Sequence, residues 1–463
     1  MDGQPAATHD LLAPLASELP SVDRLAVLPA GFAAGATAAG IKASGRPDLA
    51  VVRTTTGPAA AAAVFTQHPF AAAPVAISRE HLRASAPEGN GGYGWAEAIV
   101  ATSGCANAAT GAPGRADQLE VGRLLAAAAA VPAERTLHLS TGIIGTRLPL
   151  PAVATGLAAL VPAGLTETDE AWEAVAVGLR TTDSRTKVAT TVLALPDADG
   201  FAVRPVTVSG CAKGVGMIHP GMATMLAVVL TDATIEPAVL YDLLRPAGAR
   251  TWDQLTVDGD TSTNDTVFVL ASGASRTTSI RAGSDGARQL GRAIEAIARD
   301  LARQQAADGE GATTLLTCQV SGAVDDADAR AIARSVVGSS LVKAAAHGRD
   351  PNWGRIAAAA GNGRLADAAV LEAAGLAADV AAERAGRPIE LDPGRLRIAI
   401  AGQLVFDGPA GGPVAFDRAA TRAAMDAAEI LVRIECGLGG GRGEAFGCDL
   451  TEEYVIENAE YTT

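Results

Sequence analysis

The sequence has no long apolar segment. Its 463 residues nowhere include the roughly 20 uninterrupted apolar residues that a membrane-spanning helix requires. The first 24 residues also lack the basic start and apolar middle of a signal peptide. Positive charge is scarce, since 37 Lys and Arg residues stand against 51 Asp and Glu residues, and the net charge of -14 repels nucleic acid and anionic lipid. We therefore expect a cytoplasmic protein that binds neither nucleic acid nor membranes.

Cysteine and histidine show no disulfide or metal-binding pattern. The cysteines are odd in number, widely spaced and without a C-x-x-C pair, so we expect reduced, buried thiols. The six histidines include no H-E-x-x-H motif, and His219, in a His-Pro-Gly sequence, is typical of a turn. No metal site is predicted. The cysteines are Cys105, Cys211, Cys318, Cys436 and Cys448.

The familiar nucleotide and serine-hydrolase motifs are also missing. The segment "CGLGGGRGEA" resembles a dinucleotide-binding loop, but after Gly437 and Gly439 the third required glycine falls on Arg442. A flexible loop between strands is the better interpretation. The sequence contains neither G-x-x-x-x-G-K-[ST] nor G-x-S-x-G. Ordinary nucleotide binding and serine hydrolysis therefore lose their main support.

What the sequence does contain is an alternation of strand-like and helix-like segments with no convincing linker. Five short segments rich in β-branched residues predict strands at 201–209, 225–232, 266–273, 314–322 and 395–408. Apolar residues spaced by four, three and four, from Leu290 to Leu301, predict a helix at 286–307. Further helices are predicted at 114–130, 168–180, 326–346 and 416–429. The chain is therefore predicted to be α/β or α+β, with helices packed on sheets.

Two compositional features accompany this pattern. Alanine-rich stretches are interpreted as closely packed helix faces, and residues 1–30 as a loosely structured N-terminal extension. No repeat of fixed period is present. With 48% hydrophobic residues, the chain is long enough to form a large core.

One segment, "KGVGMIHPGMATMLAVVLTDA" at 213–233, places a threonine at the entrance to an apolar strand. A threonine hydroxyl is a weak nucleophile unless a base activates it. If the Ala223–Thr224 peptide breaks, the freed α-amine, with a pKa of about 8, can serve as that base. Nearby glycines and the Pro220–Gly221 turn allow strain at this peptide. An isolated Ala-Thr pair would, however, simply begin a strand.

The pair is not isolated, because it lies within one of eight sequence blocks that occur in a fixed order along the chain. The chain resembles, from Gly31 onward, the ornithine acetyltransferase family of arginine biosynthesis, also called glutamate N-acetyltransferase or the ArgJ family. The blocks are "GIKASGRPDLAVV", "APVAISREHL", "STGIIGTRLPL", "TTDSRTK", "AKGVGMIHPGMATML", "TVDGDTSTNDT", "DPNWGRI" and "GCDLTEEYVIENAEYTT". The resemblance implies a layered sandwich of sheets and helices. It also implies self-cleavage between Ala223 and Thr224 into an alpha chain, 31–223, and a beta chain, 224–463.

The resemblance also assigns residues to roles. Thr224 would be the nucleophile of both cleavage and acetyl transfer, and Thr141 with Gly142 would form the oxyanion hole, whose donors stabilise the tetrahedral intermediate. Lys213 could pair with a substrate carboxylate and Glu310 with the ornithine ammonium. Without the resemblance, Lys213 would be a solvated charge and Glu310 a helix-end residue. The implied substrate contacts are Thr181, Lys213, Thr224, Glu310, Asn458 and Thr463, which requires the C-terminal tail to fold back over the site.

Three features depart from the family pattern, and two shared blocks carry no predicted catalytic role. Gly221 and Cys105 stand where the family commonly has asparagine, and residues 1–30 precede the usual start. The segments "DGDTSTND" and "DPNWGRI" are interpreted as hydrogen-bonded turns and framework, with a structural role for Trp353, because their spacing does not fit a calcium loop.

The resulting hypothesis is a ping-pong acetyltransferase without a cofactor. N-acetylornithine acylates Thr224 and releases ornithine, and glutamate then takes the acetyl group. Acetyl-CoA as a second donor stays open, and the family suggests a dimer of cleaved heterodimers. The alternatives are a self-cleaving amidase or aminopeptidase with water as the acceptor, a paralogue in secondary metabolism, and a binding protein that never cleaves.

Overall fold

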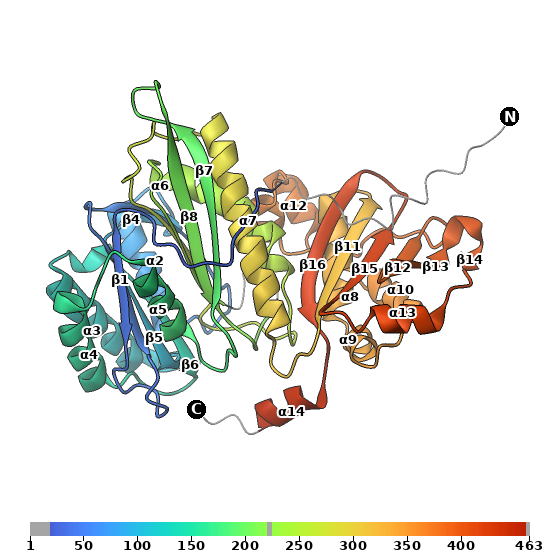
Figure 1. The fold of residues 1–463 in the computed structure, drawn as a ribbon, viewed down its shortest axis with the longest axis horizontal. Helices are drawn as coiled ribbons and strands as arrows, with labels where there is room; N and C mark the ends of the chain where they lie inside the picture. Colours follow the sequence, from blue (N-terminus) through green and yellow to red (C-terminus); the bar gives the residue numbers. More distant parts are fainter. Residues whose placement is uncertain (1–18, 220–224, 460–463) are drawn as a thin grey trace.

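The computed structural model describes residues 19–219 and 225–459, which form three β-sheets covered by helices (Figure 1). The first sheet has the order β1 (Phe32–Thr37), β2 (Leu49–Thr54), β5 (Ala98–Cys105), β6 (Thr136–Ile143). The second has the order β4 (Tyr93–Ala96), β3 (Ala59–Phe65), β10 (Thr266–Ala271), β9 (Leu226–Thr231), β8 (Val203–Lys213), β7 (Lys187–Pro196). The third has the order β14 (Gly412–Pro413), β13 (Gln403–Asp407), β12 (Arg397–Ile400), β15 (Glu429–Glu435), β11 (Leu315–Ala323), β16 (Gly441–Cys448).

The helices pack on the faces of these sheets, both in the core that the first and second sheets share and between the second and third sheets. Those of the first half are α2 (Ala73–Ser85), α3 (Gly111–Ala129), α4 (Leu150–Ala163), α5 (Asp169–Leu179) and α6 (Pro237–Arg250). Those of the second half are α7 (Asp285–Ala307), α8 (Asp326–Gly338), α9 (Ser340–His347), α10 (Trp353–Gly361), α11 (Ala368–Ala373), α12 (Ala378–Arg384), α13 (Arg418–Ala424) and α14 (Glu452–Ala459). The predicted class, a layered α/β sandwich, is confirmed.

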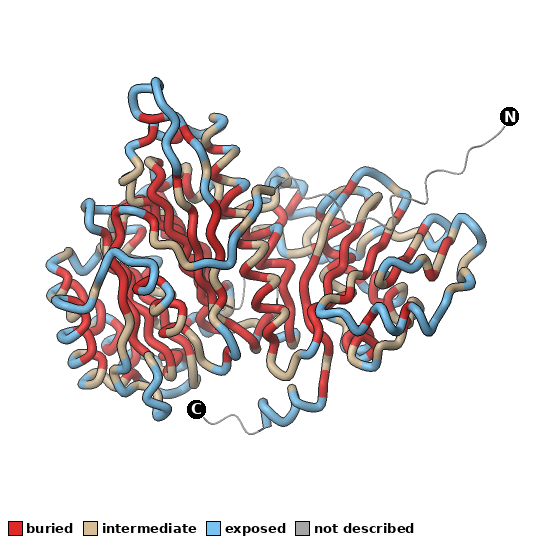
Figure 2. The backbone as a smooth tube through the Cα atoms, in the orientation of Figure 1, coloured by how far each residue is buried: buried red, intermediate tan, exposed pale blue. Residues whose placement is uncertain are grey.

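The layers follow from which face of each strand is apolar. The first and second sheets face each other across a shared core, and α3 with α4 covers the outer face of the first sheet. Helices α6 and α7 cover the other face of the second sheet. Helix α7 also contacts the third sheet, where Arg303 pairs with Glu429 at 2.7 Å. Figure 2 shows the buried strands in the interior and the exposed turns around them.

The central strands β3, β9 and β10 of the second sheet are buried on both faces, so they read as continuous apolar runs rather than alternating patterns. Leu226 and Val228 of β9 face the first sheet, whereas Ala227 and Val229 face the helices on the other side. Parallel pairing with β10 sets Leu226 opposite Thr266. The five predicted strand segments all lie in sheets, and 395–408 forms two strands, β12 and β13, which turn at Ala401 and Gly402.

One interpretation of the sequence is wrong: the alanine-rich stretch at 59–63 is not a helix face. It forms β3, a central strand in which every residue is buried. Alternate residues point to opposite faces, so Ala60 and Ala62 contact the helix side while Ala61 and Ala63 contact the first sheet. Tertiary burial on both faces therefore outweighs the high helix propensity of alanine.

The helix predictions differ in accuracy at their ends. The predicted helix at 286–307 corresponds to α7, and its stripe from Leu290 to Leu301 is fully buried. The predicted helix at 326–346 is instead two helices, because Ser339 has an extended backbone and its side chain accepts a hydrogen bond from the Val342 N–H. The predicted helix at 416–429 is only α13, since residues 429–435 join the third sheet as β15.

The N-terminal extension is not loosely structured where it is described. Asp23 forms a β-bridge with Thr190 of β7, Leu28 N–H donates to Asp169 at 2.8 Å, and Arg24 pairs with Asp300. Residues 1–18 lie outside the described part. All five cysteines are free and buried, as predicted. Among residues 19–219 and 225–459, no helix is both long enough and apolar enough to cross a bilayer.

Candidate active site

A cavity of about 420 Å³ lies where the ends of β6, β8 and the start of β9 meet. Its wall brings together residues from the whole length of the chain, including six that the sequence predicts to act there. Those six are Thr141, Gly142, Thr181, Lys213, Glu310 and Asn458. Met225, which directly precedes β9, also lines the cavity. Ala223, Thr224 and Thr463 lie outside the described residues.

Thr141 and Gly142 lie at an irregular end of β6. Cys105 of β5 pairs with both Thr141 and Ile143, so the parallel register shifts at this point. Gly142 has a φ of +127°, and a Cβ there would overlap the backbone of Gly104. Only glycine therefore lets β6 bend here while lying against β5. The bend leaves Thr141 and Gly142 at the cavity wall.

Lys213 ends β8 and points its ammonium group toward the same place. Its Nζ donates a hydrogen bond to Thr141 Oγ1 at 3.1 Å, and its backbone pairs with Leu226 of β9. Burial lowers the pKa of Lys213, an effect that the nearby carboxylate of Asp183 opposes. The side chain is thus a partly buried cation with a carboxylate nearby, and not the solvated charge that the residue alone suggested.

Beneath Lys213 lies a buried charge network that the sequence reasoning missed. Lys187 Nζ lies 2.7 Å from Asp183 Oδ1 and 2.5 Å from Asp308 Oδ2, and all three side chains are at most 4% exposed. Burial tends to raise the pKa of Asp183, but Lys187, Lys213 and the Gly214 N–H together hold it well below the usual value. Asp183 therefore stays ionised. The one available signal was Asp183 and Lys187, two residues of opposite charge four positions apart inside "TTDSRTK".

Asp183 also fixes the backbone on two sides of the cavity. Its carboxylate accepts hydrogen bonds from Gly214 N–H at 2.9 Å and from Thr181 N–H at 3.1 Å. Gly214 directly follows Lys213, and Thr181 is one of the predicted substrate contacts. Asp183 thus ties the end of β8 to the loop after α5.

Glu310 lies on another wall of the cavity with both carboxylate oxygens engaged. Oε1 accepts from Thr182 Oγ1 at 3.1 Å, and Oε2 accepts from Asn458 Nδ2 at 2.9 Å. A Cβ on Gly216 would overlap Oε2, so glycine is needed for this approach. Two carboxylate oxygens can accept about four hydrogen bonds, so Glu310 keeps capacity for a cationic group of a ligand.

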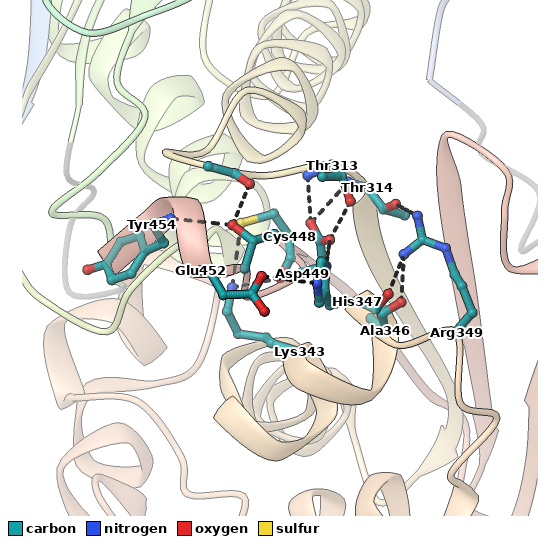
Figure 3. Close-up of polar contacts among 12 residues, drawn as sticks. Thr313, Thr314, Lys343, Ala346, His347, Arg349, Cys448, Asp449, Glu452 and Tyr454 are labelled. Carbon is teal, nitrogen blue, oxygen red and sulfur yellow. Dashed lines mark hydrogen bonds and ion pairs between the residues drawn. The ribbon is translucent and has the colours of Figure 1, made fainter. Parts of the chain in front are cut away.

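The C-terminal helix α14 carries Asn458 back to the cavity, as predicted for the tail, and the structure agrees as far as residue 459. A polar cluster fixes the chain just before this helix (Figure 3). Asp449 accepts hydrogen bonds from Thr313 N–H at 2.8 Å and from Thr314 N–H at 3.0 Å, and Lys343 Nζ donates to the Cys448 carbonyl at 2.6 Å. This anchor sets where α14 begins.

The segment "DGDTSTND" contributes more to the cavity than the sequence indicated. Asn264 Nδ2 donates to the carbonyls of Ala106 at 2.7 Å and Ser140 at 2.8 Å, which ties the start of β10 to the end of β6. Asn264 and Asp265 both line the cavity. The predicted turn also exists, because Asp258 accepts from Asp260 N–H at 3.1 Å and from Ile218 N–H at 2.9 Å. The Asp258 contact positions Ile218 on one side of residues 220–224, and on the other side the Met225 carbonyl accepts a hydrogen bond from the Thr266 N–H at 2.9 Å.

The remaining motif residues have structural surroundings. Trp353 lies against Phe406, with ring centroids 5.1 Å apart, in the core of the third sheet. Cys105, a departure from the family pattern, lies beside Thr141 and its Sγ contacts the Thr146 carbonyl at 3.2 Å. Gly221 lies outside the described residues.

Comparison with known proteins identifies relatives over most of the chain. The model of the ArgJ family matches residues 33–463. The arginine biosynthesis bifunctional protein ArgJ of Synechococcus sp. is 44% identical over 440 residues, covering 94% of this chain and 96% of that protein. The protein of the same name from Thermus thermophilus is 41% identical over 436 residues, covering 94% and 99%.

Solved structures with similarity to the chain include two proteins of related sequence. The crystal structure of arginine biosynthesis bifunctional protein ArgJ from Bacillus halodurans is 35% identical, with a TM-score of 0.45, and covers 51% of this chain and 100% of that one. The structure of ornithine acetyltransferase complexed with ornithine from Mycobacterium tuberculosis is 33% identical, with a TM-score of 0.37, and covers 44% and 98%.

Proposed function

Because the chain belongs to the ArgJ family, we propose that it transfers the acetyl group of N2-acetylornithine to glutamate in arginine biosynthesis. The observation that carries this proposal is the cavity in front of β9. Its wall carries the Thr141 hydroxyl, the partly buried Lys213 ammonium and the Glu310 carboxylate. Met225, the residue after Thr224, also lines it. These groups suit a small amino-acid substrate.

The proposed nucleophile arises by self-cleavage before Thr224. Thr224 lies two residues before β9, whose first residue pairs with both β8 and β10. Asp258 holds residues 217 and 218 on one side, and the sheet holds Met225 and Leu226 on the other. The described residues on both sides of 220–224 are therefore held in place, and this supports the proposal that the Thr224 hydroxyl attacks the preceding carbonyl. Oγ bonds to the Ala223 carbonyl carbon, the peptide C–N bond breaks, and the departing nitrogen takes the hydroxyl proton. Water then hydrolyses the resulting ester, which leaves a carboxylate on Ala223 and a free α-amine beside the restored Thr224 hydroxyl.

Acetyl transfer then follows a two-step cycle. The α-amine takes the Thr224 proton while Oγ forms a bond to the acetyl carbonyl carbon of the substrate, and the tetrahedral oxyanion develops beside Thr141 and Gly142. Collapse breaks the amide C–N bond, the proton goes to the departing amine, and ornithine leaves. The amine of glutamate then attacks the acetyl ester by the same route and restores Thr224.

Lys213 and Glu310 supply the charges in this proposal. A hydroxyl that accepts a hydrogen bond from an ammonium becomes a better donor, so Lys213 strengthens the ability of Thr141 to donate to the oxyanion. An ammonium has three donors, which leaves Lys213 free to bind a substrate carboxylate as well. Glu310 receives the ornithine ammonium. Thr181, Asn458 and Thr463 complete the substrate contacts that we propose.

Both proposed chains stay associated because they share one sheet, in which the beta-chain strands lie between alpha-chain strands. In the second sheet, β3 and β8 belong to the proposed alpha chain, 31–223, whereas β9 and β10 belong to the beta chain, 224–463. Strand β8 pairs with β9, and β3 pairs with β10, each over six residue pairs. Breaking one peptide therefore leaves two continuous strand interfaces intact. Residues 1–30 precede the alpha chain in this division as an N-terminal extension that stays covalently attached to it.

The proposal extends to three finer points. The cycle needs no cofactor. Acetyl-CoA serves as a second acetyl donor, an idea that the word "bifunctional" in the names of the relatives supports. The enzyme acts in the cytoplasm as a dimer of cleaved heterodimers.

Product analysis tests the reaction. With N-acetylornithine and glutamate together, we expect ornithine and N-acetylglutamate in equal amounts. With N-acetylornithine alone, ornithine release should stop near one equivalent per active site, because the acetyl group stays on the enzyme. Continuous release of ornithine and acetate, unaffected by glutamate, would instead identify a hydrolase. Glutamate added with acetyl-CoA and without N-acetylornithine tests the second donor by release of the free thiol.

A further inference from the structure

A second cavity of about 290 Å³ lies at the edge of the second sheet, between α2, α6 and the turn before β4. It shares no lining residue with the candidate active site. Three arginines line it: Arg79 and Arg83 from α2, and Arg245 from α6. For a protein with a net charge of -14, three guanidinium groups around one small cavity are an unusual concentration of positive charge.

None of these three arginines forms an ion pair within residues 19–219 and 225–459. Arginines elsewhere commonly do, as Arg147 does with Asp117 at 2.6 Å. Glu80, the acidic residue nearest to Arg79 and Arg83 in sequence, is already paired with Arg115 at 2.7 Å. Asp242, three residues before Arg245, forms no ion pair with it in the described part of the chain. No carboxylate of the described residues therefore forms an ion pair with the three arginines of this cavity.

Rings and carbonyl groups hold the guanidinium groups in place. The guanidinium of Arg79 lies 5.2 Å from the ring centroid of Phe65, and that of Arg245 lies 5.7 Å from that of Tyr241. Arg245 also donates to the Ala369 carbonyl at 3.2 Å. Stacking on an aromatic ring orients a guanidinium while its edge N–H groups keep their capacity to donate. Two of the three side chains are thus oriented before any ligand arrives.

Arg83 and the turn before β4 complete the wall. Arg83 donates to the Asn90 carbonyl at 2.9 Å, which fixes the start of this turn. A Cβ at Gly91, where φ is +89°, would overlap the Arg79 side chain, and one at Gly92 would lie 2.7 Å from the Tyr241 ring. The two glycines therefore let the arginine and tyrosine side chains pack directly against the turn.

We propose that this cavity is a binding site for a small oxyanion, a carboxylate or phosphate group of a metabolite. Arginine presents a planar fork of N–H donors that matches both groups. The long-range field of the protein repels anions, so only local, oriented cations could retain one.

Isothermal titration of the purified protein, with inorganic phosphate and with glutarate in a chloride-poor buffer, tests the site. We expect one anion to bind per chain, and Arg79→Gln and Arg245→Gln to weaken it by roughly 10-fold or more each. Gln67→Glu, which adds a negative charge at the cavity wall without removing an arginine, should also weaken it. Arg281→Gln, at an exposed arginine outside the cavity, is the matched control and should bind like the wild type. The tighter probe identifies the ligand chemistry.

Two further variants decide where the anion binds. Lys213→Met removes the cation of the candidate active site, so binding that survives this change belongs to the arginine cavity. Loss of binding in Lys213→Met, with retention in Arg79→Gln and Arg245→Gln, would overturn the proposal. So would an absence of binding in the wild type. Thermal unfolding of each variant confirms that it is folded, and Gln67→Glu keeps the test decisive if an arginine variant is not.

Discussion

Lys213 and Thr141 join two different sheets at the candidate active site. Lys213 ends β8 of the second sheet, Thr141 lies near the end of β6 of the first, and Lys213 Nζ donates to Thr141 Oγ1 across 3.1 Å. The contact fixes the hydroxyl orientation because an ammonium can only donate, which leaves the Thr141 proton for another acceptor. In the proposed mechanism that acceptor is the oxyanion.

Thr141→Ala should slow acetyl transfer by roughly 100- to 1000-fold, since it removes one preorganised donor to the oxyanion. The fold should persist, because the change deletes only a hydroxyl and a methyl at a cavity wall. Steady-state kinetics on fully cleaved protein provide the measurement. Turnover equal to the wild type in such a protein would show that Thr141 has no part in the oxyanion hole.

Lys213→Met and Thr141→Ala should not have additive effects. The two residues are in direct contact, so the effects of replacing them on transition-state stabilisation are not independent. The fold-loss of activity in the double variant should therefore be smaller than the product of the two single fold-losses. The four proteins of this cycle are compared by kcat/KM. If the losses multiply, Lys213 acts independently of Thr141, for example through the substrate carboxylate alone.

Glu310→Gln should raise the KM for N-acetylornithine by roughly 10- to 100-fold, because it replaces a charged partner of the ornithine ammonium by a neutral amide. The KM for glutamate, which lacks that ammonium, should change much less. Asn458→Ala removes a hydrogen bond to Glu310 and a proposed neutral substrate contact but no charge, so its effect on this KM should be smaller. Equal increases for both substrates would argue against a role in recognising the ornithine side chain.

Asp183→Asn should destabilise the fold in a pH-dependent way. Removing one member of a buried ion pair costs about 3 kcal/mol or more. The pKa of Asp183 is held below its usual value, so its stabilising effect is fully present above the unfolded pKa of about 3.9 and declines as pH falls through the lower folded pKa. The difference in unfolding free energy between wild type and variant should therefore be largest near neutral pH and shrink below pH ~4.

Denaturant unfolding at several pH values measures this difference. Asp285→Asn serves as the control, since its pair with Arg288 is exposed and should matter little. A difference for Asp183→Asn that is the same at pH ~3 and pH ~7 would contradict the assignment of a buried ionised carboxylate.

The fold could be predicted from the sequence where patterns were long and unambiguous. The apolar residues of α7 recur with the spacing of a helix, which predicts that element directly. The short continuous apolar runs of β9 and β10, rich in β-branched residues, predict buried strands. The alanines of β3 could not be placed in the same way, because alanine has no strong strand signal and its assignment depends on burial from both faces. The break at Ser339 likewise depends on a local cap inside a helical pattern.

The candidate site could be predicted in part, and mainly through the family resemblance. Short motifs such as "STGIIG" carry a role only when their partners in space are known, and the contact between Lys213 and Thr141 spans 72 residues. The network around Asp183 depends on Asp308, far away in the sequence, so no local pattern revealed it. Asn264 was missed for the same reason, because its two acceptors lie on other elements.

The most direct test of the account is the intact mass of the protein after rapid quenching with N-acetylornithine in the absence of glutamate. The account predicts two chains, the second beginning at Thr224 and heavier by one acetyl group, which glutamate then removes. Thr224→Ala should show neither cleavage nor the adduct. An active protein that remains a single chain, or an acetyl group located on any residue other than Thr224, would contradict the central claim.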